Sequence, residues 1–185
     1  MKFMQKVICC LIAIVFISGC GEKPIAEYVE TLYAIPQNVQ DLMRYYNNIA
    51  TFEVLSTEPV SYYSEASEST EYVHIAKVKI LASLKGNFKK EDIIYVRQMG
   101  DNVHQTFKHI DETLGYYEIG QKYLAFLWES DYNEEILKDI KKYYVAEAYC
   151  GQFLINENNE IIKHPSEHDL FPDAKTVDDI IEQIP

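Results

Sequence analysis

Two clusters of histidine and acidic residues are the first places where this sequence could do chemistry. In the stretch HPSEHD, His164 and His168 stand four residues apart. Glu167 and Asp169 flank the second histidine. On a helix, two histidines at this spacing would lie on one face and could share a metal ion. Pro165 interrupts the stretch in a loop-like context, which favours a solvated polar linker and leaves a metal site as the alternative.

A second cluster lies in a long polar stretch, residues 101–119, that we expect to be a loop. Loops on a rigid scaffold often carry function. None of the spacings here matches a diagnostic metal-ligand pattern, so an ordinary polar loop is favoured and a metal site stays the alternative. We expect no cofactor. The residues concerned are Asp101, His104, His109, Asp111 and Glu112.

Catalysis by a thiol is the next reaction to consider. Cys150 could act as a nucleophile with one of the five histidines. Its neighbours Ala148, Tyr149 and Gly151 indicate the end of a half-buried strand, which favours an inert buried thiol. The sequence contains no G-x-S-x-G, H-E-x-x-H, C-x-x-C, P-loop or dinucleotide fingerprint. An enzyme of unknown reaction therefore remains only an alternative, and we assign no catalytic residue.

Four Tyr-Tyr doublets are candidates for recognition. Adjacent strand residues point to opposite faces, so a doublet in a strand directs one ring inward and one outward. We expect a binding surface built from the loops 61–71 and 101–119, with outward rings such as Tyr63 and Tyr117. Ordinary strand surface is the alternative. The doublets are Tyr45-Tyr46, Tyr62-Tyr63, Tyr116-Tyr117 and Tyr143-Tyr144, and the second and third form the predicted site.

The N-terminal segment has the pattern of an export signal. Lys2 and Lys6 are the only charged residues among the first nineteen. The apolar run from Val7 to Ile17 is too short to span about 30 Å of hydrocarbon. A basic start, a short apolar core and small residues at its end are typical of a secretory signal peptide, which we place at residues 1–19.

The end of this run resembles the lipobox of bacterial lipoproteins, with Ile at the position where the family usually has Leu. The resemblance implies that the signal is removed and that Cys20 becomes the first residue, linked to diacylglycerol. Two acyl chains suffice for stable anchoring. We therefore expect an exported protein, labelled by palmitate and held on the outer face of a bacterial cytoplasmic membrane. A signal peptide with a chance cysteine is the alternative. The matching residues are Ile17-Ser18-Gly19-Cys20.

The net charge limits the classes of partner that this chain can bind, and the cysteine count limits its disulfides. The whole chain has a formal net charge of −12, and removal of Lys2 and Lys6 leaves 15 basic against 29 acidic residues, or −14. This balance argues against nucleic acid as a partner and against docking onto anionic lipid through a basic patch. After processing, only Cys20 and Cys150 would remain, and lipidation of the first leaves no intramolecular disulfide.

The remaining chain predicts mostly strands between two short helices. Residues 20–35 would be a tether. Apolar residues at helical spacing predict a helix over 36–47, and Thr176 with Asp179 predicts an N-capped helix over 176–184. Strands are expected at 49–56, 72–84, 92–100 and 121–130, with a polar hairpin loop over 61–71. A phase change in the second strand predicts a β-bulge near Ala76-Lys77.

Three segments within residues 49–162 resemble small secreted and lipid-anchored bacterial proteins that are similar to netrin and tissue-metalloproteinase-inhibitor modules. The resemblance implies a mainly β, single domain over 36–185: a small OB-like, closed or partly closed antiparallel barrel with flanking helices. We expect Ile80, Val96, Leu124 and Phe126 to be buried in mutual contact. The matching segments are Leu84-Lys85-Gly86, Ile94-Tyr95-Val96 and residues 120–127, GQKYLAFL.

The chain departs from the eukaryotic modules by lacking their disulfides. It also lacks their N-terminal cysteine that reaches a protease metal, because Cys20 is assigned to lipid. Protease inhibition is therefore not expected. The sequence predicts a membrane-anchored extracytoplasmic lipoprotein that acts as a non-catalytic binding module for an unidentified protein or glycan partner.

Overall fold

A computed structural model describes residues 36–64, 68–99, 116–130, 144–146, 150–163 and 168–184. The predicted signal peptide, the tether and Cys20 lie outside these residues. Within them no helix is both long enough and apolar enough to pass through a membrane. The elements are α2 (Val39–Tyr45), β1 (Asn48–Ser64), β2 (Ser69–Lys85), β3 (Ile93–Met99), β4 (Lys122–Glu129), β5 (Tyr144–Ala146), β6 (Gln152–Ile155), β7 (Ile161–Lys163) and α3 (Val177–Gln183).

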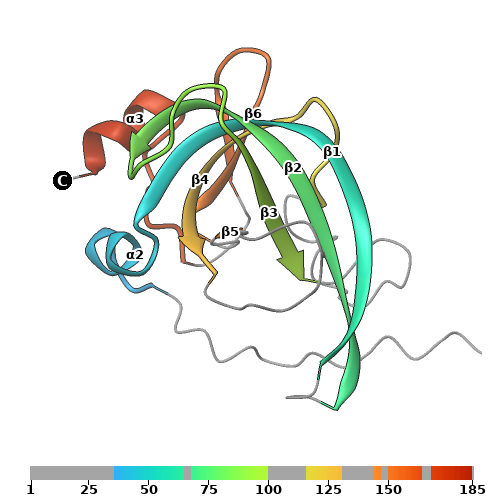
Figure 1. Cartoon of the computed structure of the whole chain (residues 1–185). Coiled ribbons are helices and arrows are strands. Elements are labelled where there is room, and N and C mark those ends of the chain that lie inside the picture. The colour runs from blue at the N-terminus through green and yellow to red at the C-terminus, as the bar shows by residue number, and fades with distance from the viewer. Residues whose placement is uncertain are drawn as a thin grey trace, which may run out of the picture.

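Five of these strands close into a ring. The sheet order is β1-β2-β3-β5-β4-β6-β7, and an additional pairing joins β1 to β4. Within the ring, β3 and β5 run parallel and the other neighbours run antiparallel. The long, strongly curved strands β1 and β2 run side by side and form one wall of the ring in Figure 1. The predicted mainly β, barrel-like fold with short helices at both ends is confirmed.

The described residues form two hydrophobic cores that share β1 and β4. The inner core fills the ring, and the outer core lies between β4, β6 and the helices. Residues 123–127 of β4 are all fully buried, so this strand contributes to both cores. Tyr123, Ala125 and Leu127 belong to the inner core, whereas Leu124 and Phe126 belong to the outer one.

This arrangement corrects one expectation about the core. Ile80 and Val96 lie in the inner core, but Leu124 and Phe126 face away from them into the outer core. The reason is that β4 has apolar residues on both faces, so alternation alone does not reveal which face points into the ring.

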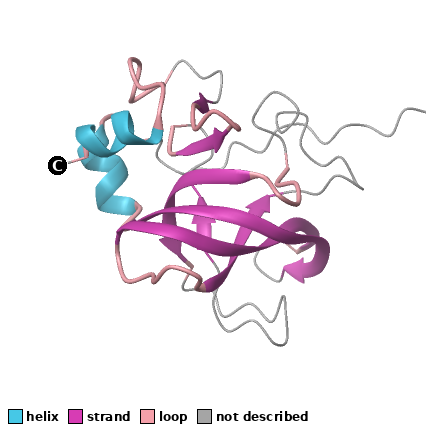
Figure 2. Cartoon of the chain, turned by 90° about the horizontal axis from the view of Figure 1, so that it is seen from above, coloured by secondary structure: helices cyan, strands magenta, loops and turns pink. Residues whose placement is uncertain are grey.

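Both helices cover the outer core from one side, as Figure 2 shows. Helix α2 spans Val39–Tyr45 and is shorter at both ends than the predicted helix over 36–47. It begins at Val39 because Asn38 caps it: the Asn38 side chain accepts a hydrogen bond from the Asp41 N–H at 2.9 Å. In α3, Thr176 and Asp179 form the predicted capping box. The N–H groups of Lys175 and Thr176 bond the Asp179 carboxylate and lower its pKa.

The hairpin between β1 and β2 is longer than predicted. The stretch 61–71 was expected to be a loop, yet β1 continues to Ser64 and β2 starts at Ser69. The pairing is irregular near Ala76-Lys77, as predicted, but the extra residue lies in β1 and not in the second strand where it was expected. The extra residue is Leu55, because the partners pass from Val54↔Val78 to Ser56↔Lys77.

Candidate functional site

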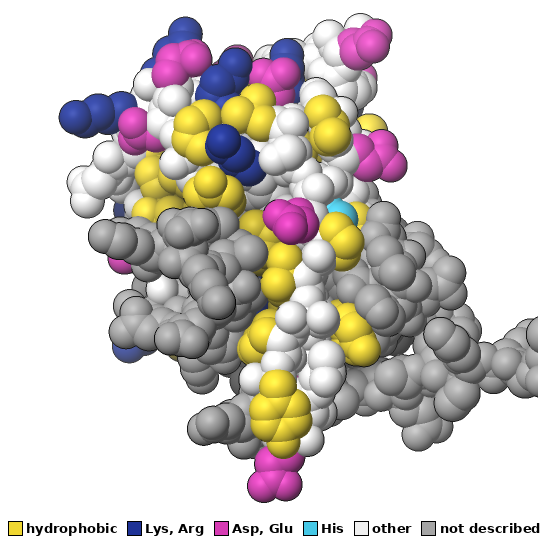
Figure 3. Space-filling model, turned by 45° about the vertical axis from the view of Figure 1, so that its right-hand side comes forward, with side chains coloured by type: hydrophobic (Ala, Val, Ile, Leu, Met, Phe, Trp, Pro, Cys, Tyr) yellow, Lys and Arg dark blue, Asp and Glu magenta, His cyan; other side chains and the backbone are white. Residues whose placement is uncertain are grey.

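Beyond Leu55, β1 leaves its ladder with β4 and pairs with β2 alone. We define this part of the hairpin, residues 55–64 and 69–77, as the arm; its β2 side still pairs with β3 from Val73 to Lys77. The β1–β4 ladder ends at Glu53↔Lys122, and the Val54 backbone then bonds to Gly120 and Gln121. Figure 3 shows one side of the molecule, on which hydrophobic and polar side chains are mixed along the described residues. The arm therefore presents two faces of alternating side chains.

One face of the arm is held by a polar cluster. The Tyr62 hydroxyl donates to Glu71 Oε2 at 2.5 Å, and Arg97 Nη2 donates to the Tyr62 hydroxyl at 2.9 Å. The Arg97 guanidinium also lies 5.8 Å from the centre of the Tyr62 ring and 3.5 Å from Glu71 Oε2. Tyr62 is half-buried, so these contacts fix the hairpin register.

The opposite face carries an aromatic strip, which we define as Tyr63, Tyr72 and Tyr116. Tyr63 pairs with Thr70, and Tyr72 is the next residue of β2 on that side, so the two rings are diagonal neighbours. Tyr63 is 65% exposed. Tyr116 lies over the buried His74, with ring centres 5.0 Å apart. Because His74 is two residues from Tyr72, all three rings lie along one face.

Tyr117 does not take part in this strip, and its predicted outward orientation is wrong. It is 2% exposed and packs in the inner core against Phe52 and Tyr123, with ring centres 5.8 Å and 4.8 Å away. Its hydroxyl donates to Gln152 Oε1 at 2.7 Å. Burial raises the pKa of both Tyr117 and Tyr123, so both stay protonated donors. The doublet alternates as expected, but its buried member fills the ring.

Of the remaining sequence candidates, the structure describes Cys150, His168 and Asp169. Cys150 is 3% exposed and lies in the outer core. Asp169 is paired with Lys163 at 2.9 Å, and His168 is exposed. No group of three His, Cys, Asp or Glu in the described part of the chain could hold a metal. His104, His109, His164 and the acidic residues beside them, Asp101, Asp111, Glu112 and Glu167, lie outside it.

A pocket of about 320 Å³ opens at the other end of β1, where β3 and β5 also begin and β4 ends. The β2–β3 turn forms its rim. Gly86 in that turn has φ +95°, and an added Cβ would lie 2.2 Å from Asn48 Oδ1, so only glycine fits there. The described lining residues are Asn48, Asn87, Phe88, Asp92, Ile93, Ile94, Glu129 and Tyr144.

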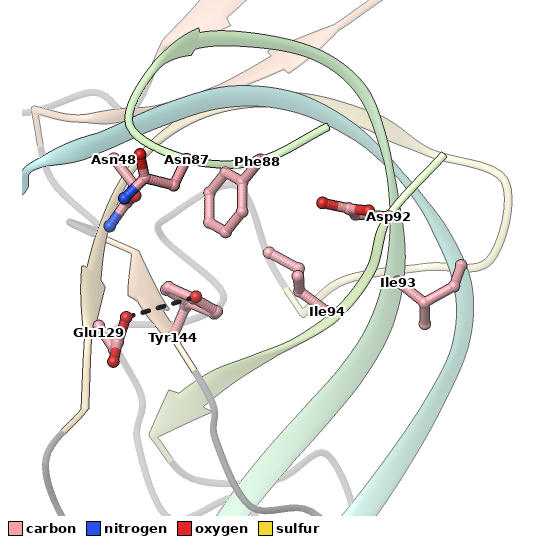
Figure 4. Close-up of a pocket in the computed structure, with 8 residues that line it drawn as sticks. All are labelled: Asn48, Asn87, Phe88, Asp92, Ile93, Ile94, Glu129 and Tyr144. Atoms are coloured by element: carbon pink, nitrogen blue, oxygen red, sulfur yellow. Dashed lines mark hydrogen bonds between the residues drawn. The ribbon is translucent and has the colours of Figure 1, made fainter. Parts of the chain in front are cut away.

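The pocket has an aromatic floor and acidic walls (Figure 4). Phe88 and Tyr144 meet edge to face with ring centres 5.0 Å apart. The Tyr144 hydroxyl reaches Glu129 Oε2 at 3.5 Å. Asp92 accepts a hydrogen bond from the Lys89 N–H at 2.7 Å, which fixes its carboxylate. The pocket therefore has a carboxylate on each of two sides, Asp92 and Glu129, and apolar side chains between them.

Sequence reasoning missed Tyr72 of the strip and the buried His74 beside it. Of the pocket residues it singled out only Tyr144, as part of the doublet Tyr143-Tyr144. Alternation with Tyr63 across the hairpin was the signal for the first two, but it needed the register. The pocket residues are scattered over almost a hundred positions, and only the ring brings them together. The chain matches no protein-family model and no curated protein.

Proposed function

We propose that this protein is a lipid-anchored, extracytoplasmic binding module whose β1–β2 arm recognises a protein or glycan partner without catalysis. The observation that carries the proposal is that the exposed Tyr63 and the half-buried Tyr72 lie on one face of the arm, where the half-buried Tyr116 packs beside them over His74. Tyrosine rings offer large contact area together with a polar tip, and they are enriched where proteins meet partners.

The anchor half of the proposal rests on the sequence around Cys20. A basic start, an apolar run and the residues Ile17-Ser18-Gly19-Cys20 together favour lipidation at Cys20 after export. The acidic balance of the chain supports a domain that stands off an anionic membrane surface and is held by its acyl chains.

The strand order supports the binding half by analogy. We propose that the ring is an OB-type barrel, because it contains five strands in the order β1-β2-β3-β5-β4 and closes through β1–β4. Barrels of this type commonly bind ligands on the face of strands 2 and 3 and at the loop between strands 1 and 2. The arm occupies the corresponding position, although a fold by itself does not assign a function.

Site-specific photo-crosslinking in intact cells tests the proposal. A photoreactive residue at Tyr63 of the anchored protein should give a discrete adduct, and the same residue at Tyr45 should not. Tyr45 is the matched control because it is also an exposed tyrosine, at 50%, and lies on α2 away from the arm (Figure 1).

With the photoreactive residue placed at Tyr116, the third member of the strip, the variants Tyr63→Ala and Tyr72→Ala should each reduce adduct formation. Equal adducts from Tyr63 and Tyr45 would contradict recognition by the arm. The anchor is tested separately: Cys20→Ala should block palmitate incorporation, and a variant that still incorporates palmitate would refute lipidation at Cys20.

A further inference from the structure

We infer that the pocket at the opposite end of β1 from the arm tip is a second binding site, and that its ligand is an aliphatic diamine or polyamine. The pocket has no part in the proposed recognition by the arm. Its volume of about 320 Å³ falls at the small end of the range for ligand sites, which suits a short flexible chain.

The two carboxylates of the pocket lie on opposite sides of its apolar middle. In Figure 4, Asp92 is on the β3 side and Glu129 is on the β4 side, with Phe88 and Ile94 between them. Two carboxylates alone are few ligands for a metal ion, and no third His, Cys, Asp or Glu joins them in a group that could hold one in the described part of the chain. A chain with a positive charge at each end could contact both.

Most of the exposed pocket surface is polar, and the smaller apolar part lies between the two carboxylates, where it can contact methylene groups. Phe88, Ile94 and Tyr144 offer apolar area to the body of such a chain, and the faces of aromatic rings also attract ammonium groups. Asn48 and Asn87 add carboxamide oxygens that can accept from an ammonium. The lining therefore offers acceptors at the ends of the ligand and apolar contacts along its length.

Charge separates this ligand class from an uncharged one. The described lining residues include Asp92 and Glu129 but no Lys or Arg. The chain as a whole carries a net charge of −12, which raises the local concentration of organic cations. A neutral diol of the same length would meet the same apolar middle without the attraction at either end.

Titration of the full chain with putrescine, butylamine and butanediol tests the inference, because the three share a four-carbon chain. Calorimetry should give the affinity order putrescine, then butylamine, then butanediol. Added salt should weaken the binding of putrescine. Amide shifts on addition of putrescine should centre on Asn87, Phe88 and Tyr144.

The variants Asp92→Asn and Glu129→Gln should each weaken putrescine binding about fivefold and leave butanediol unaffected. Glu157→Gln, an exposed residue in the β6–β7 turn, removes the same charge away from the pocket and should change nothing. The inference is overturned if butanediol binds as tightly as putrescine, if both pocket variants keep full affinity, or if the shifts centre elsewhere.

Discussion

The two halves of β1 differ sharply, although they belong to one continuous strand. From Asn48 to Val54 nearly every residue is buried, because this half pairs with both β2 and β4 and its side chains enter both cores. From Leu55 to Ser64 the described side chains are exposed or half-buried, and the pairing is with β2 alone. Leu55, the extra residue in the ladder, marks the boundary.

This contrast indicates a division of roles along the strand. The ring half contributes to stability through apolar burial on both sides. The arm half keeps its shape through its ladder to β2 and the Tyr62–Glu71–Arg97 cluster, so the rings on its other face need not support the fold. Pro59 lies in this half, and a proline on an edge strand limits further strand pairing.

The largest expected effect is on the ring half. Phe52 is fully buried and contacts the rings of Tyr117 and Tyr123. Phe52→Ala should lower the free energy of unfolding by about 3–5 kcal/mol, since it removes a buried ring and leaves a cavity. Urea unfolding followed by circular dichroism measures this change.

The matched variant on the arm is Tyr63→Ala, which also removes one ring from β1. Because Tyr63 is 65% exposed, its loss should change the free energy of unfolding by less than about 0.5 kcal/mol. If Phe52→Ala does not fold, Phe52→Leu should still lower stability measurably, by about 1 kcal/mol. Equal losses at the two positions would contradict the division between ring and arm.

Loss of the buried hydroxyl of Tyr117 should have a smaller effect on stability than Phe52→Ala. Tyr117→Phe leaves Gln152, only 4% exposed, without this donor and should cost about 1–3 kcal/mol. Burial raises the pKa of Tyr117, whereas an unfolded tyrosine ionises near pH 10. The unfolded chain therefore loses protons first, and the free energy of unfolding should fall as the pH rises above about 10.

Urea unfolding between pH 8 and 11 measures this dependence, and Tyr117→Phe should make it shallower. Tyr123 should leave a residual slope, because its pKa is also raised. Ionisation of every tyrosine near pH 10 in the folded protein, followed by ultraviolet absorbance, would contradict the burial of Tyr117.

Local sequence signals predicted the parts of the fold that depend on neighbouring residues. Thr176 and Asp179 stand at the spacing of a capping box, and the structure contains it. Lys85-Gly86-Asn87 has the composition of a turn, and Gly86 adopts the positive φ that the turn needs. Such signals operate over three or four residues, so no tertiary context is required to detect them.

Long-range features could not be predicted in the same way. The polar stretch 61–71 resembles a loop, and its strand character depends on contacts such as Tyr62 with Arg97, thirty-five residues away. The sequence did not show which face of β4 enters the ring, because residues 123–127 are apolar on both faces of the strand. The inward position of Tyr117 likewise depends on its partner Gln152.

Native-state hydrogen exchange along β1 tests the division of roles most directly. Amides of residues 49–54 should exchange only through global unfolding, because both edges of this half are paired. Amides of residues 56–63 that bond to β2 should exchange through local opening of the arm, with a clearly lower free energy. Equal protection in the two halves, at the value for global unfolding, would contradict the account.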